Sequence, residues 1–181
     1  GVMHTRKQKT VDGFELQFGV NYLSHFLLTE LLIPKLKKSK DGRIIHTSSV
    51  MHERTLVELE DLNYEKRKYS RIDAYNQSKL AQVLYARYQA TLLKKSNITS
   101  VSLHPGWVQT PLIKHTLPVF FQDVLLKPFL TMAGMINVKL GTQTTLHCLI
   151  DPSVTSYSGY YFSQFGIYKD KKSRAGGWPM K

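Results

Sequence analysis

The sequence predicts an α/β fold in which helices cover a parallel sheet. Three times along the chain, a segment with apolar residues at helical spacing precedes a short run suited to a β-strand, and glycine, proline or asparagine stands between them or after them. Such alternation indicates parallel strands, because each crossover helix carries the chain back to the same end of the sheet. The 181 residues, 42% of them hydrophobic, suffice for the core of one domain.

The first predicted unit is a long helix over residues 12–34 and a strand over residues 43–48. Apolar residues recur through the helix mostly three or four positions apart, which predicts one buried stripe. The members of this stripe are Phe14, Phe18, Leu23, Phe26, Leu27, Leu31 and Leu32, and Pro34 ends the pattern. A polar turn over residues 38–42 follows, and residues 43–48 form a short, β-branched run of the kind typical of a strand.

The second and third units repeat this order. After a charged loop over residues 52–71, residues 72–95 again show helical spacing, and residues 98–103 predict a buried strand. Pro105 and Gly106 close that strand, because proline cannot continue it and the pair opens a tight turn. A shorter helix over residues 140–150 and a strand over residues 159–162 complete the third unit.

Charge and composition narrow the class of partner. The net charge is +12, but the basic residues lie in separate clusters without interleaved aromatic residues, so we expect a solvated basic surface and no nucleic-acid partner. The single cysteine, Cys148, excludes an internal disulfide and fits a reducing intracellular compartment, and no Cys/His spacing predicts a metal site. Charges and prolines interrupt the apolar segment 112–140, which we expect to touch a membrane but not to cross it.

Tyr75 and Lys79 are the residues with the clearest chemical use. They stand four positions apart on the second predicted helix, so their side chains share one face. A phenol is a poor base at neutral pH because its pKa is near 10, and a neighbouring cation lowers that pKa. Two other tyrosine–lysine pairs, which begin at Tyr64 and Tyr168, have the same spacing but lie in charged, loop-like segments and are expected to be solvated.

Two serines follow the strand over residues 43–48, where an open parallel sheet binds its ligands. A hydroxyl at this position can hydrogen-bond a substrate oxygen. Ser48 and Ser49 can equally be turn serines that satisfy backbone groups. The residues by themselves leave both interpretations open.

Five stretches of the chain stand in the order and spacing shared by one enzyme family. They are Gly1-Val2-Met3, residues 10–29, residues 43–49, Tyr75-Asn76-Gln77-Ser78-Lys79 and residues 102–110. As a set they resemble the short-chain dehydrogenase/reductase family and, within it, the retinol dehydrogenase-like members. In this resemblance Asn21 falls on the family's catalytic asparagine, Ser49 best matches its catalytic serine, and residues 102–110 match its cofactor-contacting turn.

The resemblance implies a role for each matched residue. Tyr75 is then the general acid/base, Ser49 hydrogen-bonds the substrate oxygen, and Lys79 binds the nicotinamide ribose and lowers the phenol pKa. Asn21 holds a water that relays protons to Lys79. The implied cofactor-binding residues are Tyr75, Lys79, Pro105, Gly106, Val108 and Thr110, and no metal is implied.

The chain departs from the family at its beginning. Nothing in it resembles the Gly-rich turn that places a pyrophosphate on a helix N-terminus, or the first strands of the family's sheet. We therefore expect a partial Rossmann-type doubly wound parallel sheet, the C-terminal part of one dehydrogenase domain over residues 1–166, followed by a basic tail over residues 167–181. We also expect an open edge at strand 43–48, uncovered apolar helix faces, and weak or absent dinucleotide affinity in this chain alone.

The family resemblance predicts an oxidoreductase that interconverts a hydrophobic, retinol-like alcohol and its aldehyde or ketone. It favours NADP(H) over NAD(H), a homodimer through helices 12–34 and 72–95, and membrane association through a preceding segment. Two alternatives stay open. The chain could act as a non-catalytic interaction module of the same fold, or bind lipid and membrane surfaces through residues 112–140 and the basic tail.

Overall fold

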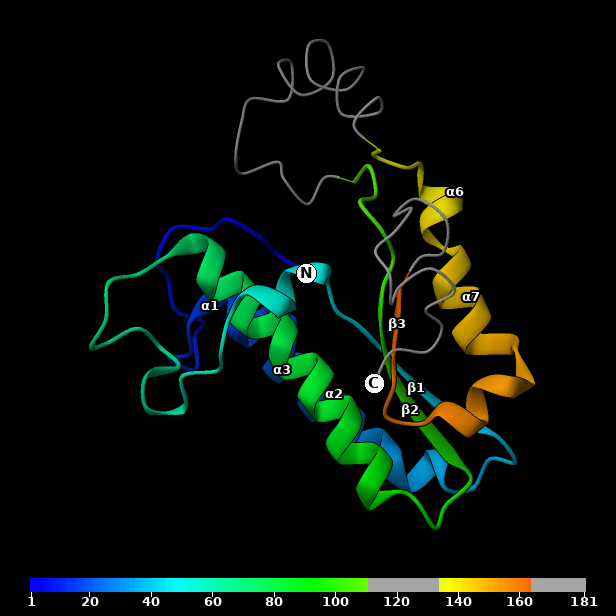
Figure 1. The fold of residues 1–181 in the computed structure, drawn as a ribbon. Coiled ribbons are helices and arrows are strands. Elements are labelled where there is room, and N and C mark those ends of the chain that lie inside the picture. The colour runs from blue at the N-terminus through cyan, green and yellow to red at the C-terminus, as the bar shows by residue number, and fades with distance from the viewer. Residues whose placement is uncertain (111–133, 164–181) are drawn as a thin grey trace.

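A computed structural model describes residues 1–110 and 134–163, in which helices and strands alternate (Figure 1). The strands are β1 (Gly42–Thr47), β2 (Ile98–His104) and β3 (Tyr161–Ser163). They form a sheet of order β1-β2-β3 in which both pairings are parallel. The predicted α/β fold with a parallel sheet is confirmed, and β1 lies at one edge of the described sheet.

The helices carry the chain between these strands. The described helices are α1 (Leu16–Phe18), α2 (Ser24–Leu36), α3 (Arg71–Leu92), α6 (Val138–Gly141) and α7 (Gln143–Ile150), with a π-helical turn η1 (Gly19–Leu23) between α1 and α2 and short 3-10 helices η2 (Val50–Arg54), η3 (Leu59–Asp61) and η6 (Pro152–Tyr157). The hydroxyl of Ser70 caps α3 by accepting a hydrogen bond from the backbone N–H of Asp73 at 3.2 Å. This cap explains why the helix begins at residue 71.

The predicted helix over residues 12–34 is wrong in its details. Residues 10–14 form a turn in which Gly13 has φ +87°, and the helix begins only at Leu16, where the Glu15 carboxylate accepts from the N–H groups of Gln17 and Phe18. The helix then widens into the π-turn η1 and continues to Leu36, beyond Pro34. A cap and a π-turn depend on tertiary contacts, which spacing does not report.

The two faces of the sheet are covered by different helices. On one face, the α3 side chain Gln89 contacts both His46 of β1 and Ser100 of β2. On the other face, Cys148 of α7 packs with the main hydrophobic core. That core consists of Val101, Leu103, Cys148, Val154 and Phe162. The sheet therefore lies between α3 and α7 (Figure 1).

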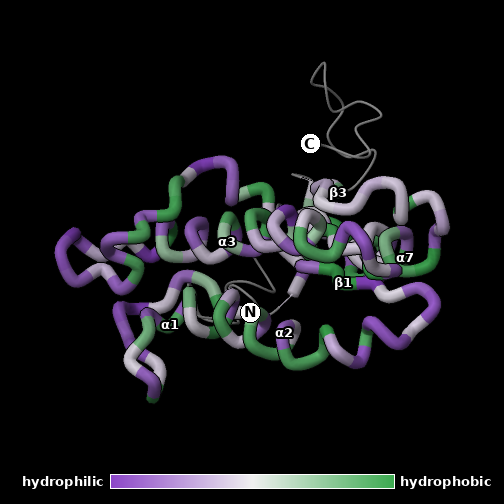
Figure 2. Tube along the Cα trace, turned by 90° about the horizontal axis from the view of Figure 1, so that it is seen from below, coloured by the Kyte–Doolittle hydropathy of each residue, from purple (hydrophilic) through white to green (hydrophobic). Residues whose placement is uncertain are grey.

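The apolar stripe of α2 is largely exposed, which contradicts its predicted burial. Leu31 is 67% exposed, and Phe26, Leu27 and Leu32 are exposed as well. Figure 2 shows α2 on the outside of the molecule with hydrophobic residues along it. The end of the helix, at Ile33 and Leu36, packs against buried residues of the sheet and of the α3–β2 connection, and the Phe26 ring meets the buried Tyr85 of α3. The expectation of uncovered helix faces and of an open edge at β1 is thus confirmed for the described residues.

Tyr64 is buried, so its predicted solvation is wrong. It is only 2% exposed, the guanidinium of Arg67 stands 3.9 Å from its ring centroid, and the Tyr69 ring meets it edge-on at 5.2 Å. A cation over an aromatic face is attracted by the ring quadrupole, which explains why a charged segment can bury this residue. Burial also raises the pKa of the Tyr64 phenol to about 12.

Two predicted segments lie largely or wholly outside the described residues. Most of the apolar segment 112–140 and the whole of the tail 167–181 fall there, as does the tyrosine–lysine pair that begins at Tyr168. Within the ranges 1–110 and 134–163, no helix combines the length and the apolar character needed to cross a membrane.

Candidate active site

The fold brings Tyr75 and Lys79 to the carboxyl end of β1. Both side chains are buried, and the Lys79 Nζ donates hydrogen bonds to the backbone oxygen of Thr47 at 2.9 Å and to Oε1 of Gln82 at 3.2 Å. The same Nζ lies 5.6 Å from the centroid of the Tyr75 ring. Because Thr47 is the last residue of β1, Tyr75 and Lys79 lie where parallel sheets bind ligands.

The two serines after β1 have different partners. Ser48 donates its hydroxyl hydrogen to the backbone oxygen of Lys79 at 2.7 Å, which ties β1 to α3 and matches the interpretation as a turn serine. Ser49 caps η2 by accepting from the N–H of Met51 at 3.2 Å, and its side chain acts on the Tyr75 phenol by lowering the pKa of that group. Of the two hydroxyls, Ser49 is therefore the one that meets the Tyr75 phenol.

Burial dominates the electrostatics of this group. It raises the pKa of Tyr75 above its ordinary value, and the hydrogen bond with Ser49 opposes that shift only in part. Burial also lowers the pKa of Lys79 to about 8. The direction for Tyr75 is opposite to the predicted lowering, because burial removes hydration from the phenol and only Ser49 opposes its effect on the pKa.

Asn21 lies in the π-turn η1 and is fully buried. Its side chain donates to the backbone oxygen of Val2 at 2.9 Å and to the hydroxyl of Ser78 at 3.0 Å, and it accepts from the N–H of Val2 at 2.7 Å. Its backbone oxygen accepts from Nε2 of Gln82 at 2.7 Å. The π-turn thus places Asn21 against α3, and such turns are frequent at functional sites.

Gln82 joins Asn21 to Lys79, a link that the sequence reasoning missed. Its Oε1 accepts from the Lys79 ammonium while its Nε2 donates to the Asn21 backbone oxygen. Ser78 was missed as well, although it accepts from the Asn21 amide and donates to the backbone oxygen of Tyr75 at 2.7 Å. The spacing of residues 75, 78, 79 and 82 along one helix face is the signal that could have found them.

The predicted cofactor-contacting turn follows β2 at the same edge of the sheet. Gly106 has φ +96°, a conformation that side chains rarely adopt, and Pro105 precedes it. Val108 pairs with Ile136 in an isolated parallel bridge, and its methyl groups press against Gly141, where an added Cβ would stand 2.5 Å from one of them. Thr110 is exposed. The turn is therefore held from behind by α6 while its outer end is open to solvent.

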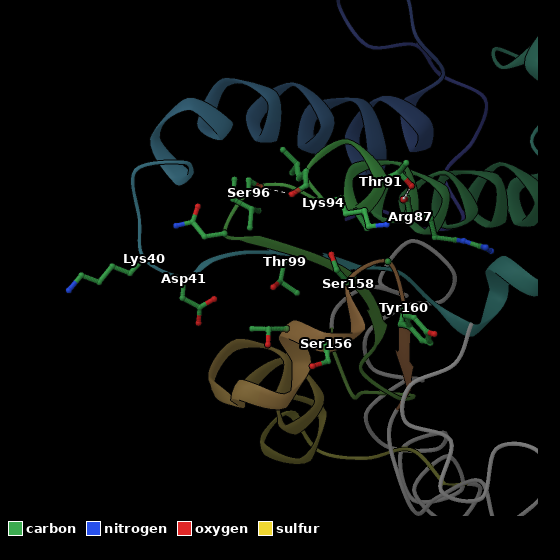
Figure 3. A pocket seen from close by; sticks show the side chains of 16 residues that line it. Lys40, Asp41, Arg87, Thr91, Lys94, Ser96, Thr99, Ser156, Ser158 and Tyr160 are labelled. Atoms are coloured by element: carbon green, nitrogen blue, oxygen red, sulfur yellow. Dashed lines mark hydrogen bonds between the residues drawn. The ribbon is translucent and has the colours of Figure 1, made fainter.

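A cavity of about 970 Å³ lies at the other end of the strands from the candidate site (Figure 3). The polar turn before β1, the end of α3 and the turn that follows η6 line it, with Lys40, Arg87, Lys94, Thr99 and Ser158 among its residues. Thr99 is the second residue of β2, so this cavity lies at the amino ends of the strands. Ser49, Tyr75 and Lys79 do not line this cavity, and it is not part of the predicted site.

A family model described as short chain dehydrogenase matches residues 1–118. The chain belongs to the short-chain dehydrogenase family. It is 42% identical to retinol dehydrogenase 12 of Homo sapiens over 163 residues, which covers 90% of this chain and 50% of that protein. It is 41% identical to retinol dehydrogenase 13 of Mus musculus, with 89% of this chain and 48% of that protein covered. The predicted retinol dehydrogenase-like membership is confirmed, and the chain spans about half the length of these curated relatives.

Solved structures share the fold of this short-chain dehydrogenase family member. The NADPH-bound carbonyl reductase from chicken fatty liver matches with a TM-score of 0.57 at 22% identity, over 90% of this chain and 62% of that one. The 3-ketoacyl-(acyl-carrier-protein) reductase from Brucella melitensis, complexed with NADH, matches with a TM-score of 0.59 at 20% identity, over 90% and 62%. At these identities the likeness establishes the Rossmann-type fold.

Proposed function

We propose that the natural protein containing this chain is an oxidoreductase that interconverts a hydrophobic, retinol-like alcohol and its aldehyde or ketone. The observation that carries the proposal is the convergence of Ser49, Tyr75 and Lys79 at the carboxyl end of β1, where Ser49 acts on the pKa of the Tyr75 phenol. The retinol dehydrogenases that the chain resembles support the substrate class. We also propose that Asn21, Ser49, Tyr75 and Lys79 carry the catalytic roles.

The residues fit one end of a nicotinamide dinucleotide, which supplies or accepts the hydride when bound. Lys79 offers a buried ammonium whose hydrogen-bond partners among the described residues are neutral oxygens, and Gly106 leaves the backbone of the turn open to close approach. Pro105, Val108 and Thr110 would line the same end. Similarity to the retinol dehydrogenase-like members favours NADP(H) over NAD(H).

The side chains of this chain then transfer one proton to or from the substrate. Tyr75 transfers it to or from the substrate oxygen, and Ser49 donates a second hydrogen bond that holds this oxygen beside the phenol. We propose that the charge of Lys79 favours the phenolate form of Tyr75 and so opposes the effect of burial, which raises the Tyr75 pKa. Gln82 joins the ammonium to the backbone oxygen of Asn21 and so holds Lys79 against the π-turn, where Asn21 would hold the water that relays protons to Lys79.

The uncovered face of α2 supports a second role, as an interaction surface. Leu27, Leu31 and Leu32 are exposed there, and the helices α2 and α3 are the elements through which we expect a homodimer. Exposed apolar patches of this kind mark contacts with other protein surfaces. If the chain acts as a non-catalytic interaction module, it would bind a protein partner through α2 but would not turn over a substrate.

The decisive experiment replaces Tyr75 by phenylalanine in the natural protein. Tyr75→Phe removes only the transferable proton, so turnover of a retinol-like alcohol should fall by at least about 100-fold. Dinucleotide binding, measured by fluorescence titration, should be retained. Tyr64→Phe is the matched control, because the Tyr64 phenol is buried without a hydrogen-bond partner among the described residues. Near-normal turnover of Tyr75→Phe would remove the catalytic assignment.

A further inference from the structure

His104 is a buried histidine whose ring nitrogens both lack a partner. It is the last residue of β2, it is 6% exposed, and neither Nδ1 nor Nε2 has a hydrogen-bond partner among the described residues. The contrast with His46 is direct, because the equally buried His46 ring meets Oε1 of Gln89 at 2.9 Å. Buried polar groups in native proteins almost always have a partner, so His104 requires an explanation.

The alternation of side chains along β2 sets the direction of His104. Val101 and Leu103 face α7 as members of the main core, whereas Ser100 donates to Gln89 of α3. Residues two apart share a face, so His104 points with Ser100 and Ser102 toward α3. The same face is covered beyond α3 by η2, whose His52 ring lies 4.6 Å from the ring of Tyr161, the register partner of Ser102.

His104 therefore lies directly beneath the candidate active site. The backbone N–H of Ser48 donates to the oxygen of Leu103 at 2.7 Å, which places Ser48 beside His104. His52, Glu53 and Lys79 are the charged or titratable neighbours that act on the ring. Burial, with smaller contributions from His52 and Lys79, lowers the pKa of His104 to about 4, and Glu53 opposes this shift. At neutral pH the ring is uncharged, so one nitrogen donates and the other accepts.

Ser102, two residues earlier on the same face, is fully buried, and its hydroxyl also lacks a partner among the described residues. Two positions along a strand stand roughly 7 Å apart at their Cα atoms. Because the histidine side chain is long, one water between the two side chains could accept from one group and donate to the other. No group of three His, Cys, Asp or Glu side chains in the described ranges is arranged as metal ligands. A neutral ligand that both donates and accepts fits this pair.

We propose that His104 is a positioning residue of the active site that, with Ser102, binds an internal water between the end of β2 and η2. The inference rests on the proposed function. The water would fix η2, and with it Ser49, because Nδ1 of His52 in η2 already meets the backbone oxygen of Ser49 at 2.6 Å. Ser49 in turn acts on the Tyr75 phenol, so a loosened η2 would displace the hydroxyl that holds the substrate oxygen in the proposed function.

The test replaces His104 by leucine, which fills similar space without polar atoms. A histidine that is merely unsatisfied would predict unchanged turnover and equal or higher stability, because an apolar group removes a buried polar penalty. Our proposal predicts that kcat falls at least tenfold while the KM for the dinucleotide changes less than twofold and the midpoint of urea unfolding does not fall. His104→Gln, which keeps a donor and an acceptor, should recover most of kcat.

His46→Leu is the matched control on the neighbouring strand. It breaks the hydrogen bond with Gln89, so it should lower the unfolding midpoint while leaving kcat within about twofold. This result is the opposite of that expected for His104→Leu. Equal losses of kcat in the two leucine variants would overturn the proposal, because a general disturbance of the sheet would then explain both.

A measurement without turnover separates this inference from the proposed function. In the natural protein, a water-to-protein NOE at the His104 imidazole N–H should be present, and it should disappear in Ser102→Ala. An absent NOE in the wild type overturns the positioning role even where the enzyme is active. An inactive wild type with the NOE present would instead contradict the proposed function and leave the bound water in place.

Discussion

The two faces of β2 differ although every residue of the strand is buried. Toward α7 the strand presents Val101 and Leu103, which pack with Cys148 and Phe162 in an apolar core. Toward α3 it presents Ser100, Ser102 and His104, a polar row that continues into Lys79 and Gln82 above it. One strand thus supplies the packed core on one face and the floor of the candidate site on the other.

This difference shows how one short element serves stability and chemistry together. Apolar burial stabilises in proportion to the area removed from water and requires no direction. Polar burial is costly unless each group finds a partner, so it persists where it supports a specific arrangement. We therefore expect substitutions on the α7 face to act mainly on stability and substitutions on the α3 face to act mainly on pH dependence and turnover.

The largest effect is expected from breaking the apolar face at its centre. Leu103→Ala leaves a cavity in a fully buried cluster and should lower the free energy of unfolding by about 4 kcal/mol. Urea unfolding of the natural protein measures the loss. A loss below about 1 kcal/mol would show that Leu103 is not central to the core.

The free energy of unfolding should depend on pH because His104, on the α3 face of β2, is buried in its neutral form. The pKa of His104 is lowered to about 4 in the folded protein, whereas an unfolded histidine titrates near 6.5. Between these values the unfolded chain binds more protons, so the free energy of unfolding should fall by up to about 3 kcal/mol as the pH drops from 6.5 to 4. The contribution is fully present above pH 6.5.

Carboxylates and His46 also titrate in this range, so the comparison needs a reference protein. The pKa of His46 is lowered by burial too, and its contribution has the same sign. The measurement is therefore the difference in unfolding free energy between wild type and His104→Leu at pH 7 and at pH 4.5. A difference that does not change with pH would contradict a buried neutral His104.

A smaller effect is expected where α6 supports the turn after β2. In Gly141→Ala the new Cβ would overlap a methyl group of Val108, and we expect a cost of about 2 kcal/mol in the free energy of unfolding. Val108→Ala in the same chain should relieve the overlap and restore part of the stability. Thermal unfolding of the single and double variants measures this coupling, and strictly additive losses would refute the contact.

The smallest effect should come from a single hydrogen bond on the polar face. Ser100→Ala removes the donation to Oε1 of Gln89 and should lower the free energy of unfolding by about 1 kcal/mol. Comparison with Leu103→Ala sets the two faces of the same strand side by side. Equal losses at the two positions would remove the distinction between them.

Much of the site was predictable because its signals are local. The four-residue spacing of Tyr75 and Lys79 needs only the geometry of a helix, and Ser49 stands at the end of a short apolar run. The family resemblance placed Asn21 as well. The same local rules failed at Tyr64, whose burial depends on Arg67 and Tyr69.

By itself, the sequence determined the alternation of helices and strands, the family, and the residues at the carboxyl ends of β1 and β2. The tertiary structure alone decided that Asn21 lies in a π-turn against Ser78 and Gln82, that the α2 stripe is exposed, and that His104 is buried without a partner. It also decided that burial raises the pKa of Tyr75. Periodicity and motif spacing are properties of neighbouring residues, whereas burial, partner choice and pKa depend on which distant segments exclude water from a group.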